Sequence, residues 1–157
     1  MKEHHTKEHS MNPRTDFYAA SPDAMKAMTA LAVAVGKLGL EAPLVELIEL
    51  RASQINGCAY CVDMHTSDMR KAGETERRLA CLVVWRETPF FTARERAVLA
   101  WTEALTCLAD THAPDADYAD LAEHCTPAEM VAVTMAINLI NSWNRLAVGF
   151  RKMPGKE

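Results

Sequence analysis

The rest of the chain is organised around the stretch Ile55-Asn56-Gly57-Cys58-Ala59-Tyr60-Cys61-Val62-Asp63-Met64-His65. It contains two cysteines with two residues between them, and a histidine four residues after the second cysteine. Because an α-helix completes a turn in about 3.6 residues, a helix that starts near Cys58 gathers one stripe of side chains against the protein. That stripe comprises Cys58, Cys61, Val62, His65, Met69 and Ala72. The sequence therefore predicts two thiols and an imidazole side by side inside the protein.

Thiol redox chemistry needs this arrangement. One thiolate attacks the substrate, the second thiol resolves the product as a disulfide, and a neighbouring base favours the thiolate. The pair follows the Asn56-Gly57 break, where the free amides and positive dipole end of a new helix stabilise negative sulfur. His65 follows Cys61 by one turn, within reach as a base or hydrogen-bond partner. The motif thus favours a peroxidase or a disulfide oxidoreductase.

Zinc binding is the main alternative for the same residues. A structural zinc ion usually takes four cysteine or histidine ligands, and the motif supplies at most Cys58, Cys61 and His65. No second Cys-x-x-Cys pair occurs, and His124-Cys125 is a separate adjacent pair. Zinc remains the second interpretation of the motif, and we expect no bound metal.

Composition excludes several classes of protein. A chain of 157 residues with 49% apolar and 24% charged residues is most simply one globular domain. The net charge of -4 gives no electrostatic reason to expect a nucleic acid or an anionic membrane as partner. We find no run of 18 apolar residues and no signal-peptide core behind the polar N-terminus, and we expect a cytoplasmic protein. Five cysteines, an odd number, argue against a framework of structural disulfides.

The fold class is predicted from helical spacing and capping residues. Thr92 with Glu95 and Thr126 with Glu129 are capping boxes, in which side chain and backbone satisfy each other's amides. No segment alternates apolar and polar residues long enough to indicate a strand. We therefore expect an all-α protein of about seven helices and no sheet. They begin near Pro22, Pro43, Cys58, Thr75, Thr92, Pro114 and Pro127.

The sequence predicts an N-terminal arm followed by one domain. Residues 1–16 are polar and lack helical periodicity, so we expect a flexible N-terminal arm. Its histidines, His4, His5 and His9, are interpreted as solvated rather than metal-binding. Residues 17–157 are expected to form a single helical domain. Its last helix is apolar almost all round from Met130 to Ile140, which is typical of a helix central to a core or shared with another subunit.

Glu46 stands twelve positions before Cys58, and Cys61 and His65 follow. The spacing of these four residues resembles the signature of the alkylhydroperoxidase AhpD family, part of the carboxymuconolactone decarboxylase-like superfamily. The resemblance extends from Leu44 to about Trp101 and includes the ending from Asn141 to Ala147. It implies an AhpD-like helical fold, cysteine-dependent reduction of hydroperoxides without a bound cofactor, and assembly into homo-oligomers, often trimers or hexamers.

The resemblance also implies roles for these residues. Cys61 would attack the peroxide, Cys58 would resolve the product, and His65 with Glu46 would relay protons. An external dithiol or a thioredoxin-like protein would supply the electrons. Well-studied members carry a histidine immediately before the second cysteine, where this chain has Tyr60, a possible accessory residue. The lactone-decarboxylating relatives lack the cysteine pair, so its presence argues against decarboxylation.

Two other functions use the same residues. A protein disulfide reductase would exchange electrons with a partner and turn over little peroxide. A zinc-stabilised or purely structural helical oligomer would leave both thiols inert.

Overall fold

In the computed structural model, helices form where the caps and the apolar spacing predict them. The structure describes residues 12–155, which form nine α-helices and one 3₁₀-helix and contain no strand. The all-α prediction is confirmed; the larger count comes from two four-residue helices and from the 3₁₀ turn that follows α5. The elements are α1 Phe17–Ala20, α2 Pro22–Val35, α3 Ala42–Asn56, α4 Ala59–Lys71, α5 Glu76–Cys81, η1 Leu82–Glu87, α6 Ala93–Thr106, α7 Leu108–Thr111, α8 Asp115–His124 and α9 Pro127–Gly149.

The capping residues act as the sequence predicts. Both capping boxes form, at the start of α6 with Thr92 and at the start of α9 with Thr126. Thr75 caps α5 by accepting a hydrogen bond from the amide of Arg78. The apolar spacing from Met25 to Leu38 predicts a helix that Gly39 closes. In the structure α2 ends earlier, at Val35.

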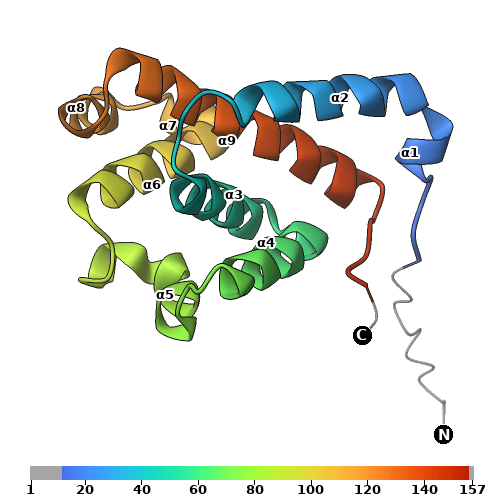
Figure 1. Cartoon of the computed structure of the whole chain (residues 1–157), viewed down its shortest axis with the longest axis horizontal. Coiled ribbons are helices and arrows are strands. Elements are labelled where there is room, and N and C mark those ends of the chain that lie inside the picture. The colour runs from blue at the N-terminus through green and yellow to red at the C-terminus, as the bar shows by residue number, and fades with distance from the viewer. Residues whose placement is uncertain (1–11, 156–157) are drawn as a thin grey trace, which may run out of the picture.

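Helix α3 lies at the centre of the molecule, between α9 on one side and α4 on the other (Figure 1). Its apolar side chains enter two clusters, one with α6, α8 and α9 and another with α4, α5, η1 and α6. Helix α9 contacts α2, α3, α4, α6 and α8, which explains within a single chain why so much of its sequence is apolar. None of the helices of residues 12–155 combines the length and the apolar character needed to cross a membrane.

A buried polar cluster ties the end of α3 to α9. The amide nitrogen of Asn56 donates to the side-chain oxygens of Asn141 at 3.0 Å and Asn144 at 2.9 Å. Asn144 in turn donates to the hydroxyl of Ser53 at 3.0 Å. Ser53 and Asn144 are almost fully buried, so these groups depend on one another for hydrogen bonds. The cluster fixes the segment that leads directly into Cys58.

We predict that Asn144→Ala lowers the free energy of unfolding by about 2–3 kcal/mol, because it removes the hydrogen bonds to Asn56 and Ser53 from a buried polar cluster. Urea denaturation followed by circular dichroism measures the change. Asn138→Ala is the matched control, since Asn138 lies on the same helix with an exposed side chain; we expect it within about 0.5 kcal/mol of the parent. Equal stability of the two variants would contradict the proposed dependence.

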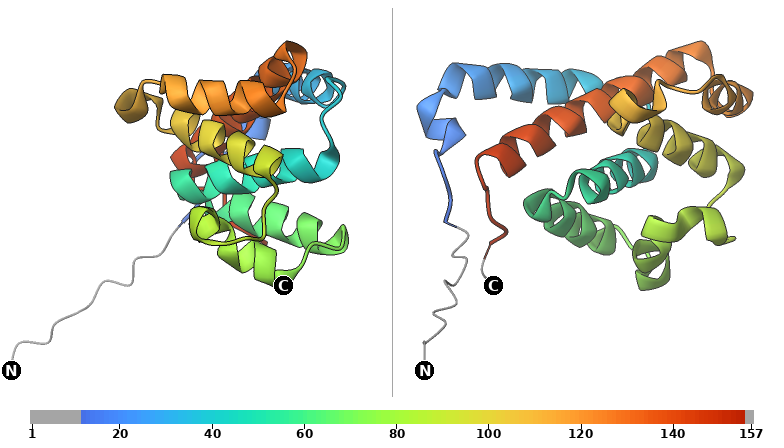
Figure 2. Two further views of the ribbon diagram at one scale, coloured as in Figure 1. Left: turned by 90° about the vertical axis from the view of Figure 1, so that its left-hand side faces the viewer. Right: turned by 180° about the vertical axis from the view of Figure 1, so that it is seen from behind.

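The two ends of the described chain run side by side (Figure 2). The backbone amide of Arg14 donates to the carbonyl of Phe150 at 3.0 Å, and its guanidinium donates to the carbonyl of Gly149 at 2.7 Å. Asp16 then caps α1. The N-terminal histidines lie outside the described residues, and the expected arm and single domain stay predictions.

Candidate functional site

The two cysteines stand at the junction of α3 and α4. Gly57 ends α3 in the left-handed conformation, with φ of 65°, which a glycine adopts without steric cost. The chain then turns so that Cys58 becomes the N-cap of α4, where its sulfur accepts a hydrogen bond from the amide of Cys61 at 3.3 Å. Cys58 and Cys61 are joined by a disulfide, and their exposed fractions are only 1% and 3%. The remaining cysteines of the described chain, Cys81, Cys107 and Cys125, are free thiols.

The predicted stripe on α4 is largely confirmed. Cys58, Cys61, His65 and Met69 are buried and Val62 is half-buried, as the helical spacing requires. Ala72 is the exception and is exposed, because α4 ends at Lys71 and the chain turns away there.

His65 contacts two carboxylates from α3. Its Nδ1 lies 3.0 Å from Oε2 of Glu46 and 3.5 Å from Oε2 of Glu49. The imidazole is buried, and its other nitrogen, Nε2, has no hydrogen-bond partner within residues 12–155. With Nδ1–H donated to the carboxylates, a neutral His65 presents the lone pair of Nε2 for accepting a proton.

The charges of this cluster are coupled. Burial raises the pKa of Glu49 from 4.5 to about 7; the nearby His65 lowers it and the negative charge of Glu46 raises it. For His65, burial lowers the pKa, but the hydrogen bond with Glu46 and the charges of Glu49 and Glu46 outweigh burial and raise it above 6.5. Near neutral pH the cluster therefore holds protons that it can both give and take.

A cavity of about 200 Å³ brings the reactive groups together. Cys61, His65 and Glu49 line it, whereas Glu46 faces a separate pocket that also contains Asp68. Residues from α1, α2, α4, α9 and the C-terminal segment complete the walls: Phe17, Tyr18, Ala32, Tyr60, Met64, Leu139, Ile140, Trp143, Ala147 and Lys152. Of the four residues inferred from the resemblance, Cys61 and His65 line the cavity. Glu46 contacts His65, and Cys58 is bonded to Cys61.

Tyr60 is half-buried and lines the same cavity. It packs against Cys58, Cys61 and Ala147, and its ring centroid lies 4.4 Å from Nζ of Lys152. The residue at the position of the family's histidine therefore contributes an aromatic wall and a cation contact.

Sequence reasoning missed Glu49. Helical spacing after Pro43 puts Glu46, Glu49 and Ser53 opposite the apolar residues of this helix and predicts a polar side. In the structure Ser53 is fully buried and Glu49 half-buried, because α4 and α9 pack against α3. The available signal was the three-residue spacing from Glu46 to Glu49, which puts two carboxylates on one helix face.

Two groups of side chains in residues 12–155 have ligand atoms close enough to share a metal ion. One is Glu46, Glu49 and His65, and the other is Asp120, Glu123 and His124. Neither contains a cysteine, and Cys58 and Cys61 are held in the disulfide, so the zinc set considered from the sequence is not assembled in this structure.

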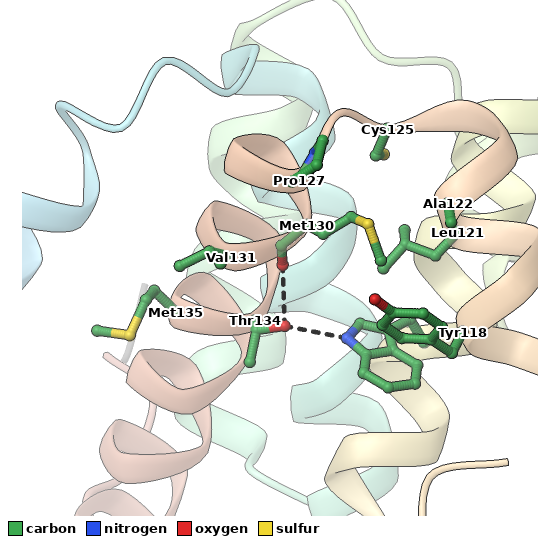
Figure 3. Close-up of a pocket in the computed structure, with 10 residues that line it drawn as sticks. Tyr118, Leu121, Ala122, Cys125, Pro127, Met130, Val131, Thr134 and Met135 are labelled. Atoms are coloured by element: carbon green, nitrogen blue, oxygen red, sulfur yellow. Dashed lines mark hydrogen bonds between the residues drawn. The ribbon is translucent and has the colours of Figure 1, made fainter. Parts of the chain in front are cut away.

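A second pocket lies elsewhere, among α6, α8 and α9 (Figure 3). Its volume is about 440 Å³, and its walls are mostly apolar, among them Tyr118 and Met130. The indole nitrogen of Trp101 donates to the hydroxyl of Thr134 at 3.0 Å; Figure 3 marks the hydrogen bonds of Thr134 with dashed lines. The pocket includes Cys125 but none of the redox motif, so the candidate site is the smaller cavity at Cys61.

Comparisons with known proteins show the family of the chain. The model of the "Carboxymuconolactone decarboxylase family" matches residues 22–104. The uncharacterized protein YdfG of Bacillus subtilis (strain 168) is 40% identical over 138 residues, which cover 88% of this chain and 94% of YdfG.

Two solved structures have the same architecture. A protein of unknown function from Agrobacterium tumefaciens, for which the role of antioxidant defence protein AhpD has been suggested, has a TM-score of 0.91 and 46% identity and covers 93% of this chain and 100% of its own. An uncharacterized peroxidase-related protein from Silicibacter sp. TM1040 has a TM-score of 0.77 and 26% identity, over 88% of this chain and 73% of its own. These matches agree with the helical fold and with the cysteine pair beside its histidine and carboxylates. The chain therefore belongs to the carboxymuconolactone decarboxylase family, as an AhpD-like member.

Proposed function

We propose that this protein is a thiol-dependent peroxidase that reduces hydroperoxides with the Cys58–Cys61 pair. The observation that carries the proposal is the position of Cys61 on a cavity beside His65 and Glu49, with the second cysteine bonded to it. The site thus combines an attacking sulfur, a resolving sulfur and side chains that can donate a proton.

The cycle starts from both cysteines reduced. The Cys61 thiolate attacks the terminal oxygen of ROOH, the O–O bond breaks, and Cys61 becomes a sulfenic acid while RO⁻ leaves. The cluster of His65, Glu49 and Glu46 supplies the proton that converts RO⁻ to ROH. Cys58 then attacks the sulfenic sulfur, which releases water and forms the disulfide. An external dithiol or a thioredoxin-like protein returns two electrons and two protons.

Glu49 adds a third residue to the proton relay of His65 and Glu46 that the resemblance implies. A proton donor to the leaving alkoxide must be protonated near neutral pH, and the pKa of Glu49, raised by burial to about 7, meets that requirement. Because Tyr60 occupies the position of the family's histidine, Glu49 offers this chain an additional proton donor on the cavity wall.

Burial of the sulfurs favours a small oxidant over a protein disulfide. Cys58 and Cys61 are 1% and 3% exposed, so a peroxide that enters the cavity reaches Cys61 more readily than a disulfide on a folded partner. The alternative function, a disulfide reductase with little peroxidase activity, would require faster exchange with protein disulfides than with peroxide in a direct rate comparison.

The test of the proposal is intact-mass spectrometry of the reduced protein after one equivalent of cumene hydroperoxide. We expect the loss of two hydrogen atoms, mapped by peptide analysis to Cys58 and Cys61. Thiols left unchanged would refute the peroxidase function, and zinc in protein purified without a chelator would support a structural role.

The proposal includes the cellular location of the protein and its oligomeric state. We infer a cytoplasmic protein that requires no organic cofactor and assembles into homo-oligomers, trimers or hexamers, as the resemblance implies. Light scattering on the purified protein measures the oligomeric state; a monomer at micromolar concentration would contradict it.

Glu49 makes stability depend on pH in a defined direction. Its pKa is higher in the folded chain than its ordinary value of 4.5, so its contribution is complete below pH 4.5 and is lost as the pH rises through about 7. We predict that the Tm of the parent falls relative to that of Glu49→Gln between pH 5 and 8. Glu87→Gln, at an exposed acid, is the control and should parallel the parent; a constant difference for Glu49→Gln would contradict the prediction.

A further inference from the structure

The cavity beside Cys61 carries a positive charge that the peroxidase cycle does not use. Lys152, which follows the end of α9, lines it together with Cys61, His65 and Glu49. The volume of about 200 Å³ exceeds that of an engineered apolar cavity of about 150 Å³ that binds benzene. A ring-sized apolar body therefore fits between the reactive sulfur and the cation.

The backbone and three aromatic rings hold Lys152 in place. After α9 the chain turns at Arg151, with φ of 53°, and the amide of Lys152 donates to the carbonyl of Ala147 at 2.8 Å. The ammonium lies 4.4 Å from the ring centroid of Tyr60, 4.6 Å from that of Tyr18 and 5.6 Å from that of Phe17. Cation–π attraction to several rings keeps the charge at the cavity.

The rings leave the hydrogen-bond donors of the ammonium free. Among residues 12–155 no side-chain hydrogen bond or salt bridge involves Nζ of Lys152. In particular, the ammonium does not pair with Glu49, the carboxylate that lines the same cavity. A partly enclosed cation with unused donors is suited to an anion, because hydrogen bonds between charged groups are the stronger ones.

We propose that the cavity binds organic hydroperoxides that carry a carboxylate on an apolar body of about ring size, with Lys152 as the anchor for the carboxylate. The proposal rests on the proposed peroxidase function and names its substrate class. Ile140 and Trp143 line the cavity where the apolar body would lie, and the ammonium of Lys152 attracts the acid group of the substrate. The acid group therefore points to Lys152, and the hydroperoxide is left for Cys61.

A different role for Lys152 would be to stabilise the thiolate of Cys61 directly. The two roles separate by substrate charge. An anchor affects anionic ligands alone, whereas a thiolate stabiliser affects every peroxide equally and changes the pH at which Cys61 reacts.

The test measures binding of unreactive probes to the oxidised protein by calorimetry at pH 7. We expect benzoate to bind more tightly than benzyl alcohol, and Lys152→Met to weaken benzoate by at least about tenfold while leaving benzyl alcohol within about twofold. Lys152→Arg should retain most of the preference for benzoate. Lys37→Met removes an exposed lysine and should change neither probe, and thermal melting verifies that each variant is folded.

The outcomes of this test distinguish failure of the carboxylate subsite from failure of the peroxidase function. Equal binding of the two probes, or an unchanged preference in Lys152→Met, would overturn the carboxylate subsite. A parallel loss of cumene hydroperoxide reduction, with a higher pH for alkylation of Cys61, would assign Lys152 to the thiolate and also overturn the subsite. Benzoate binding that depends on Lys152 in a protein without peroxidase activity would retain the subsite and refute the peroxidase.

Discussion

Replacing Cys61 with serine is expected to lower peroxide consumption by at least about 10³-fold, because a serine hydroxyl does not ionise near neutral pH and is a far weaker nucleophile than a thiolate. Cys61 is the cysteine that lines the cavity with His65 and Glu49, whereas Cys58 is the N-cap residue behind it. Consumption of cumene hydroperoxide, followed with a dithiol in excess, measures the effect.

Cys58→Ser should behave differently from Cys61→Ser. The first oxidation survives, and a sulfenic acid accumulates on Cys61 because no second thiol condenses with it. A sulfenic-acid probe such as dimedone should label this variant and not Cys61→Ser. Cys107→Ser is the control, since Cys107 is a half-buried free thiol outside the cavity; it should keep the parental rate. Full activity in Cys61→Ser would reject the assignment of the attacking sulfur.

Replacing His65 with asparagine is expected to lower the rate constant for Cys61 oxidation by about 10²–10⁴-fold, the range of a positioned acid or base. The imidazole contacts both carboxylates, at 3.0 and 3.5 Å, so its loss removes the connection that it makes between Glu46 and Glu49. Glu46→Gln should have a smaller effect, because Glu49 still faces Nδ1 and fixes which nitrogen carries the proton.

The rate of alkylation of reduced Cys61 by iodoacetamide, measured against pH, separates a chemical from a structural effect of His65. In the parent the reaction should proceed below pH 8, and in His65→Asn its midpoint should move toward the ordinary thiol pKa of about 8.5. His112→Asn, at an exposed histidine, should leave the profile unchanged. An unchanged midpoint in His65→Asn would assign the histidine a packing role.

Local signals predicted most of the helices, because caps and apolar spacing act within a few residues of the chain. The two capping boxes at Thr92 and Thr126 form as the sequence indicates. The differences occur at helix ends, where apolar spacing continues beyond the last helical turn: α2 closes at Val35 before Gly39, and Ala72 follows the end of α4 at Lys71. The short helices α1 and α7 are too brief for periodicity to reveal.

The residues of the candidate site also differ in whether the sequence alone reveals them. The Cys58–Cys61 pair and His65 are visible in the sequence because they lie within two turns of one helix. Glu46 is suggested only by the resemblance, and the structure adds its contact with His65. Glu49 was hidden because a glutamate on the polar side of a helix has its pKa changed only when other helices cover it, as α4 and α9 do here.

Sequence alone determined the fold class, the family and the residues that can carry redox chemistry, since each depends on spacing along the chain. Tertiary structure alone decided that Glu49 joins His65, that Tyr60 faces a lysine, and that Lys152 shares the cavity of Cys61. The physical reason is distance along the sequence: Lys152 lies about ninety residues after Cys61, and only the packing of α9 against α3 and α4 brings its charge to the sulfur's side of the molecule.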